Sequence, residues 1–162
     1  MPARYAHFLR TGDEQALAMV VEHNAWDVAS MAALVGLYGE PVELLAPDDL
    51  ACLARTLKRG KALDLAHQVA ERAISRGAGP NGYRVRGEIA KARGDRDAAL
   101  ADFEHLSREV DDPALRLELA KLYEHHVKAP EKALEVVLAG TGEAEPALAR
   151  RRSRLEKKAG RT

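Results

Sequence analysis

Two residues in the N-terminal part of the sequence, His23 and Asp27, are of types that can together assist phosphodiester hydrolysis. They stand four positions apart, so on a helix they would share one face. A carboxylate can hold a divalent metal ion, and a nearby imidazole can orient or deprotonate a water molecule. The pair therefore predicts half of a metal-assisted site, although a His and an Asp at this spacing are more often a hydrogen-bonded surface pair.

A complete site of this kind needs further carboxylates. Two-metal cleavage uses several carboxylates around ions that lie about 4 Å apart. One carboxylate cannot complete the octahedral oxygen shells that two Mg²⁺ ions demand. No Asp-x-Glu motif stands on a plausible strand in this sequence. We therefore expect no complete catalytic cycle from this chain alone.

The elements that would position these residues are helices. Strand signals are nearly absent, whereas apolar residues recur at helical spacing through the chain. Asp13 can cap a helix that carries His23 and Asp27. Gly36 and Gly39 weaken this helix, and Pro41 ends it. A later predicted helix contains Cys52, the only cysteine, which we expect to be a small buried residue. A single cysteine excludes an intrachain disulfide.

An internal period of 34 residues separates Arg59-Gly60 from Arg93-Gly94, and Ala99 from Ala133. This is the period of the tetratricopeptide repeat, a unit of two antiparallel helices. The clearest unit runs from Tyr83 to about Pro113. Six residues stand at the spacings that the motif uses: Tyr83, Gly87, Ala90, Gly94, Ala99 and Phe103.

The small residues of this unit explain how its helices would pack. Gly87 and Ala99 lack bulk, so two antiparallel helices can approach closely, and Gly94 supplies the turn. In the following unit, the connecting loop from His125 to Pro130 is one residue longer. We predict an all-α fold of tetratricopeptide-like antiparallel helical hairpins stacked as a short α-solenoid. The Arg- and Lys-rich last helix favours a solvated cap, with a phosphate-binding tail as the alternative.

The N-terminal part resembles a known family. The similarity rests on Tyr5-Ala6-His7-Phe8-Leu9-Arg10-Thr11-Gly12-Asp13 and on His23-Asn24-x-x-Asp27-Val28. These residues resemble the end of the catalytic domain in the predicted YprB-type ribonuclease-H-like exonucleases, which belong to the DEDD group of 3′–5′ exonucleases. In that family, tetratricopeptide-like helices often follow the catalytic domain, and the basic ending from Arg151 to Lys158 also looks similar.

The resemblance implies roles for individual residues. Asp27 would match the last acidic metal ligand, and His23 would match the residue that orients the attacking water. Mg²⁺ or Mn²⁺ would be the cofactor only together with the remaining catalytic part. Residues 1–42 would be the C-terminal end of a ribonuclease-H-like domain. Residues 43–162 would be the helical repeats with a basic capping helix.

The predicted function is that of a scaffold or interaction module, inactive as a nuclease by itself. The alternative is a stand-alone tetratricopeptide-type adaptor with no nuclease connection. By resemblance to such units, a concave groove would bind a protein, a peptide or the missing catalytic domain through Arg84, Glu88, Lys91, Leu117, Lys121 and Glu124. The 25 basic and 25 acidic residues balance, so the net charge gives no indication that the chain binds nucleic acid or a membrane. Nucleic acid would bind through the parent enzyme. We expect a cytoplasmic location.

Overall fold

The computed structural model describes residues 2–39 and 41–160. These residues form nine α-helices and one π-helical turn, and they contain no β-strand, so the predicted all-α class is confirmed. The chain divides into two compact units, residues 1–45 and 46–162.

The first unit consists of α1 (Pro2–Thr11) and α2 (Gln15–Tyr38), which pack against each other. Short polar side chains hold the turn between them. The backbone N–H of Asp13 donates to Thr11 Oγ1 at 3.2 Å, and the backbone N–H of Gln15 donates to Asp13 Oδ1 at 3.0 Å. Because Asp13 satisfies an N–H group at the start of α2, it acts as the predicted cap. The helix continues through Gly36 and ends before Pro41.

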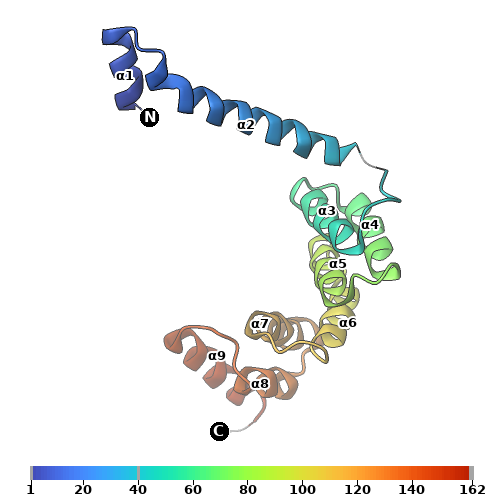
Figure 1. Cartoon of the computed structure of the whole chain (residues 1–162). Coiled ribbons are helices and arrows are strands. Elements are labelled where there is room, and N and C mark those ends of the chain that lie inside the picture. The colour runs from blue at the N-terminus through green and yellow to red at the C-terminus, as the bar shows by residue number, and fades with distance from the viewer. Residues whose placement is uncertain (1, 40, 161–162) are drawn as a thin grey trace. The chain divides into compact units, whose positions relative to one another are not determined.

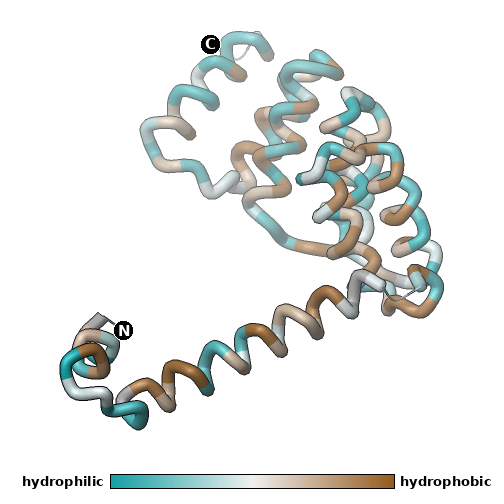
Figure 2. The backbone as a smooth tube through the Cα atoms, turned by 90° about the horizontal axis from the view of Figure 1, so that it is seen from above, coloured by the Kyte–Doolittle hydropathy of each residue, from teal (hydrophilic) through white to brown (hydrophobic). Residues whose placement is uncertain are grey.

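Apolar side chains of α2 lie largely in solvent. Figure 2 shows hydrophobic residues recurring along the whole helix. A helix that is apolar on most of its sides is typical of the core of a larger fold. Seven large apolar side chains of α2 are each more than half exposed: Met19, Val21, Trp26, Val28, Met31, Leu34 and Val35.

Residues 46–160 of the second unit form seven α-helices, each packed against the next in chain order (Figure 1). Because the connectors from α3 to α4 and from α5 to α6 are short, these pairs run antiparallel. The first helices of the first two pairs also contact each other, since α3 packs against α5. The helices are α3 (Pro47–Arg59), α4 (Leu63–Ser75), α5 (Gly79–Arg93), α6 (Arg96–Leu106), α7 (Pro113–Leu122), α8 (Pro130–Leu138) and α9 (Glu145–Lys158).

Gly87 marks the closest approach of α5 and α6. A Cβ atom at this position would lie 2.6 Å from Cε1 of Phe103, which is only 2% exposed. Ala90 and Ala99 are buried in the same cluster as Phe103. Gly94 ends α5 with a φ of +86°, a left-handed conformation that glycine adopts without strain. Small residues therefore permit this helix pair to nest, as the sequence predicts.

The connection between α7 and α8 differs from the expected loop. Residues Tyr123–Val127 continue α7 as a π-helical turn, named η1, and the chain leaves it at Lys128 with a φ of +60°. The prediction of a loop starting at His125 is therefore wrong. A π-helical turn accommodates one extra residue within a helix, which is a physical reason why the longer connection needs no longer loop. It also brings the side chain of Glu124 into the interior.

Candidate functional site

His23 and Asp27 lie together on α2. The distance between His23 Nε2 and Asp27 Oδ2 is 3.5 Å, and the two side chains are 62% and 58% exposed. Within residues 2–39 and 41–160, no group of three or more His, Cys, Asp or Glu side chains is placed to hold a metal ion. The pair thus has the expected proximity. The role of Asp27 as a metal ligand stays a prediction.

A second candidate site is a face formed by the first helices of the pairs, which we call the α3–α5–α7 face. Lys58 of α3 pairs with Glu88 of α5. Arg84 of α5 donates to Asp112, the N-cap of α7, at 2.6 Å. In both pairs the partners are about 30 residues apart in sequence, since the separations are 30 and 28. Ion pairs therefore connect α3 to α5 and α5 to α7 on this face.

The same pattern continues toward α7. Lys91 of α5 pairs with Glu118 of α7, and Lys121 donates to the other carboxylate oxygen of Glu118 at 2.7 Å. Burial tends to raise the pKa of Glu118, but hydrogen bonds from Lys121 and Lys91 outweigh it, and the net pKa is lowered. Glu118 therefore remains ionised and holds two cations in place. Lys91 and Glu118 lie at a cavity of about 470 Å³, lined by Lys58, Glu88, Lys91, Ala92, Phe103 and Glu118.

Five of the six predicted groove residues keep at least part of their surface in solvent: Arg84, Glu88, Lys91, Leu117 and Lys121. Glu124 differs, because its side chain has no exposed surface. The structure adds Lys58, Asp112 and Glu118, which the sequence reasoning did not name. A search for opposite charges about 30 residues apart would have found all three, because each pairs with a residue on a neighbouring first helix.

Glu124 is the centre of an ion-pair cluster between η1 and α9. Arg154 donates to its two carboxylate oxygens at 2.7 and 2.8 Å, and Lys158 donates at 2.8 Å. The hydrogen bonds from Arg154, helped by Lys158, lower the pKa of Glu124 to about 2 against the effect of burial. Leu155, between these two cations in sequence, is completely buried. α9 is therefore joined to η1 by charge and to the core by packing.

This pKa gives the stability a pH dependence. Because the folded-state pKa of Glu124 lies below the usual value near 4.5, folding favours its ionised form. Its contribution is complete above about pH 5 and is lost as the pH falls toward 2. We expect the difference in free energy of unfolding between the wild type and Glu124→Gln to be constant from pH 7 to 5 and to shrink below pH 4.5. Urea titrations across this range measure it. A difference unchanged at pH 3 would contradict the assignment.

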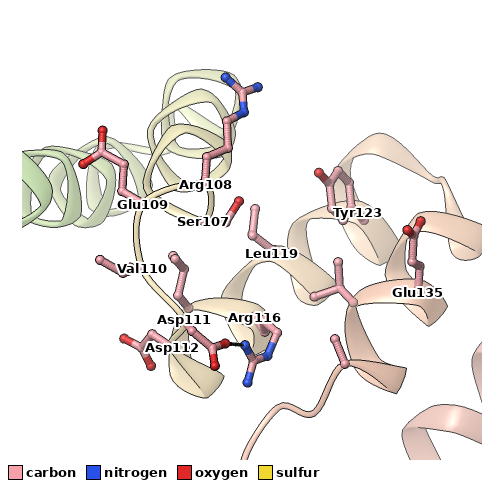
Figure 3. Close-up of a pocket in the computed structure, with 13 residues that line it drawn as sticks. Ser107, Arg108, Glu109, Val110, Asp111, Asp112, Arg116, Leu119, Tyr123 and Glu135 are labelled. Atoms are coloured by element: carbon pink, nitrogen blue, oxygen red, sulfur yellow. Dashed lines mark hydrogen bonds and ion pairs between the residues drawn. The ribbon is translucent and has the colours of Figure 1, made fainter.

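A separate cavity of about 440 Å³ lies between the α6–α7 connector, α7 and α8 (Figure 3). Leu119 and Val136 give it apolar walls, while Arg116 pairs with Asp111 at its rim. Tyr123, also in its lining, donates to Glu104 at 2.7 Å. Burial and this hydrogen bond raise the pKa of Tyr123. The phenol therefore stays protonated near neutral pH and acts as a structural donor.

Comparison with known proteins assigns this chain to no family. No protein-family model matches the sequence, and no curated protein matches it significantly. No helix in the part of the chain that the structure describes is both long enough and apolar enough to cross a membrane.

Proposed function

We propose that the second unit is a tetratricopeptide-like helical-repeat module that binds a protein segment along the α3–α5–α7 face. The observation that supports this most is the set of ion pairs between successive first helices. Their partners are separated in sequence by 30, 28 and 27 residues, close to one repeat length. Stacked hairpins place their first helices side by side on a concave surface, which is where such arrays bind partners.

The chemistry of this face favours a polypeptide partner. Lysine and arginine alternate with carboxylates along it, so it offers charges of both signs. A polypeptide can match such a pattern residue by residue, whereas a line of phosphates would meet Glu88 and Glu118 as repulsive groups. The cavity of about 470 Å³ gives room for a side chain of the partner between two ion pairs.

Site-specific photocrosslinking tests this proposal. We expect a photoreactive phenylalanine derivative at Leu117, on the predicted groove side of α7, to crosslink to one partner protein in cells of the source organism. The same derivative at Leu138, an exposed residue of α8 (57%), is the matched control and should give none. A partner recovered equally from both positions, or only from Leu138, would overturn the assignment of the binding face.

A second candidate function concerns the first unit. We infer that α1 and α2 pack against a ribonuclease-H-like exonuclease domain, with the repeat module as its scaffold. The supporting observation is that α2 is apolar along its length, with seven large apolar side chains more than half exposed. His23, Asp27 and Ser30 fall within about 60° of one another on a helical wheel at 100° per residue, as a narrow polar stripe. In a larger fold, this stripe would present the imidazole and the carboxylate together.

For the chain by itself we expect no digestion of single-stranded DNA with Mg²⁺ or Mn²⁺. The physical reason is that Asp27 supplies one carboxylate, and two-metal hydrolysis needs several. The measurement is a time course of oligonucleotide length, with Asp27→Ala as the matched variant. Robust cleavage that disappears in Asp27→Ala would show that the chain carries a complete site.

A further inference from the structure

Half-exposed cations gather at the C-terminal end of the α3–α5–α7 face. They come from three helices, α5, α7 and α9, and each has 40–47% of its side-chain surface in solvent. Such cations meet an approaching partner before the groups beneath them. We call this set the cationic strip, and its members are Lys91, Lys121, Arg154 and Lys158.

The carboxylates that hold the strip in place are more buried than the cations. Glu118, between Lys91 and Lys121, is 27% exposed, and Glu124, between Arg154 and Lys158, is not exposed at all. Four cations therefore share two carboxylates. Because the cations also lie nearer the solvent, the field at this surface is positive although the whole chain is neutral.

α7 connects the two halves of the strip. Glu118, Lys121 and Glu124 follow one another at intervals of three residues, so each lies about one turn further along α7 and η1 than the one before. Lys91 reaches this side from α5, and Arg154 reaches it from α9. Lys121 is also close enough to Glu143, the partner of Arg151, to help lower its pKa. The contacts of Lys121 with Glu118 and its interaction with Glu143 thus connect the two pairs of cations.

We propose that the cationic strip binds an acidic segment of the partner protein, in which several Asp or Glu side chains follow one another. This proposal rests on the proposed function, because it names the chemistry of the segment that the face takes. Carboxylates from the partner would compete with Glu118 for its two lysines. Opposite charges also steer the encounter, so binding should weaken as salt rises.

A nucleic acid is the less favoured occupant. Binding of single strands uses aromatic side chains on which bases stack, in addition to positive charge. None of the four residues of the strip carries a ring on which a base could stack, and the phenol of Tyr123 in η1 is engaged with Glu104. A line of phosphates would also lie against Glu118, whereas a polypeptide can place a neutral residue there.

Fluorescence anisotropy with labelled decaglutamate tests the proposal on the full chain. We expect saturable binding that is tighter than that of a labelled decathymidylate and that weakens between 50 and 300 mM salt. Absence of saturable decaglutamate binding at 50 mM salt would overturn the proposal. Equal or tighter binding of decathymidylate would overturn it in favour of phosphate recognition.

Two variants with opposite expected effects sharpen the test. The double substitution Lys91→Gln and Lys121→Gln should weaken decaglutamate binding about fivefold, because it removes two partly exposed ion pairs with the peptide. Glu118→Gln should strengthen it about twofold, because it frees the same two lysines. Circular dichroism of both variants checks that each keeps its helical structure. Weaker or unchanged binding by Glu118→Gln would contradict the proposal.

The matched control removes two exposed cations outside the strip, Lys61 and Arg96. Lys61→Gln with Arg96→Gln changes the net charge by the same amount and should alter binding less than twofold. An effect as large as that of the strip variant would show that only net charge matters and would overturn the proposal.

A crosslink at Leu117 without decaglutamate binding would reject the acidic segment and leave the binding face intact. Loss of the crosslink would instead reject the proposed function.

Discussion

Replacing Glu124 by glutamine should lower the free energy of unfolding of the second unit by about 3 kcal/mol. Removing one partner of a buried ion pair costs about 3–5 kcal/mol because the other charges lose their compensation. Here the carboxylate is fully buried, whereas Arg154 and Lys158 keep nearly half of their surface in solvent. The effect should therefore fall at the lower end of that range. Urea denaturation at pH 7, monitored by circular dichroism, measures this change in the free energy of unfolding.

Glu135→Gln is the matched control for this prediction. Glu135 is an exposed residue of α8, so the same chemical change should alter the free energy of unfolding by less than about 0.5 kcal/mol. Equal effects of the two substitutions would show that Glu124 does not hold α9 against η1. The comparison thus separates the buried cluster from a general effect of lost negative charge.

Gly87→Leu should cost a similar amount, about 3 kcal/mol, by overpacking the crossing of α5 and α6. A Cβ atom there would already lie 2.6 Å from the ring of Phe103 and 3.2 Å from Cβ of Asp102. Phe103 has little freedom to move, because it is buried and Asp102 beside it is held by Arg86 at 2.6 and 3.0 Å. Thermal and urea unfolding of the variant measure the loss.

The control for this substitution is Gly60→Leu. Gly60 has a φ of −74°, and a Cβ there would meet only backbone oxygens at 3.5 Å or more. We expect a change below about 1 kcal/mol, because the added side chain meets no clash. If Gly87→Leu were tolerated as well as Gly60→Leu, the helix crossing described around Gly87 would be incorrect.

Composition and helical spacing were enough to predict the all-α class and the helix that carries His23 and Asp27. Local steric rules also predicted the close helix crossing at Gly87, because a residue without a side chain leaves room for one. Cys52, in contrast, was expected to be buried and is exposed. The buried positions of α3 are Leu50, Ala51 and Ala54, which place Cys52 on the solvent side. A short helix with apolar residues on several sides does not reveal its buried face from sequence alone.

The ion-pair partners could not be predicted from the sequence because they depend on how neighbouring helices are aligned. Glu124 illustrates this: helical spacing placed it with the groove residues, but η1 and α9 enclose it. The roles of His23 and Asp27 stay predictions for a similar reason, since a metal site depends on groups brought together from other elements. Their proximity on α2 follows from helix geometry in any fold.

Carbodiimide crosslinking followed by peptide mass spectrometry examines whether the first helices lie side by side in solution. The reagent joins a lysine directly to an accessible carboxylate that it contacts, because the bond contains no spacer. We predict two links between residues far apart in sequence: Lys58–Glu88 and Lys91–Glu118. If lysines were joined only to carboxylates within one helical turn of their own helix, α3, α5 and α7 would not form a common face, and the proposed binding function would fail with it.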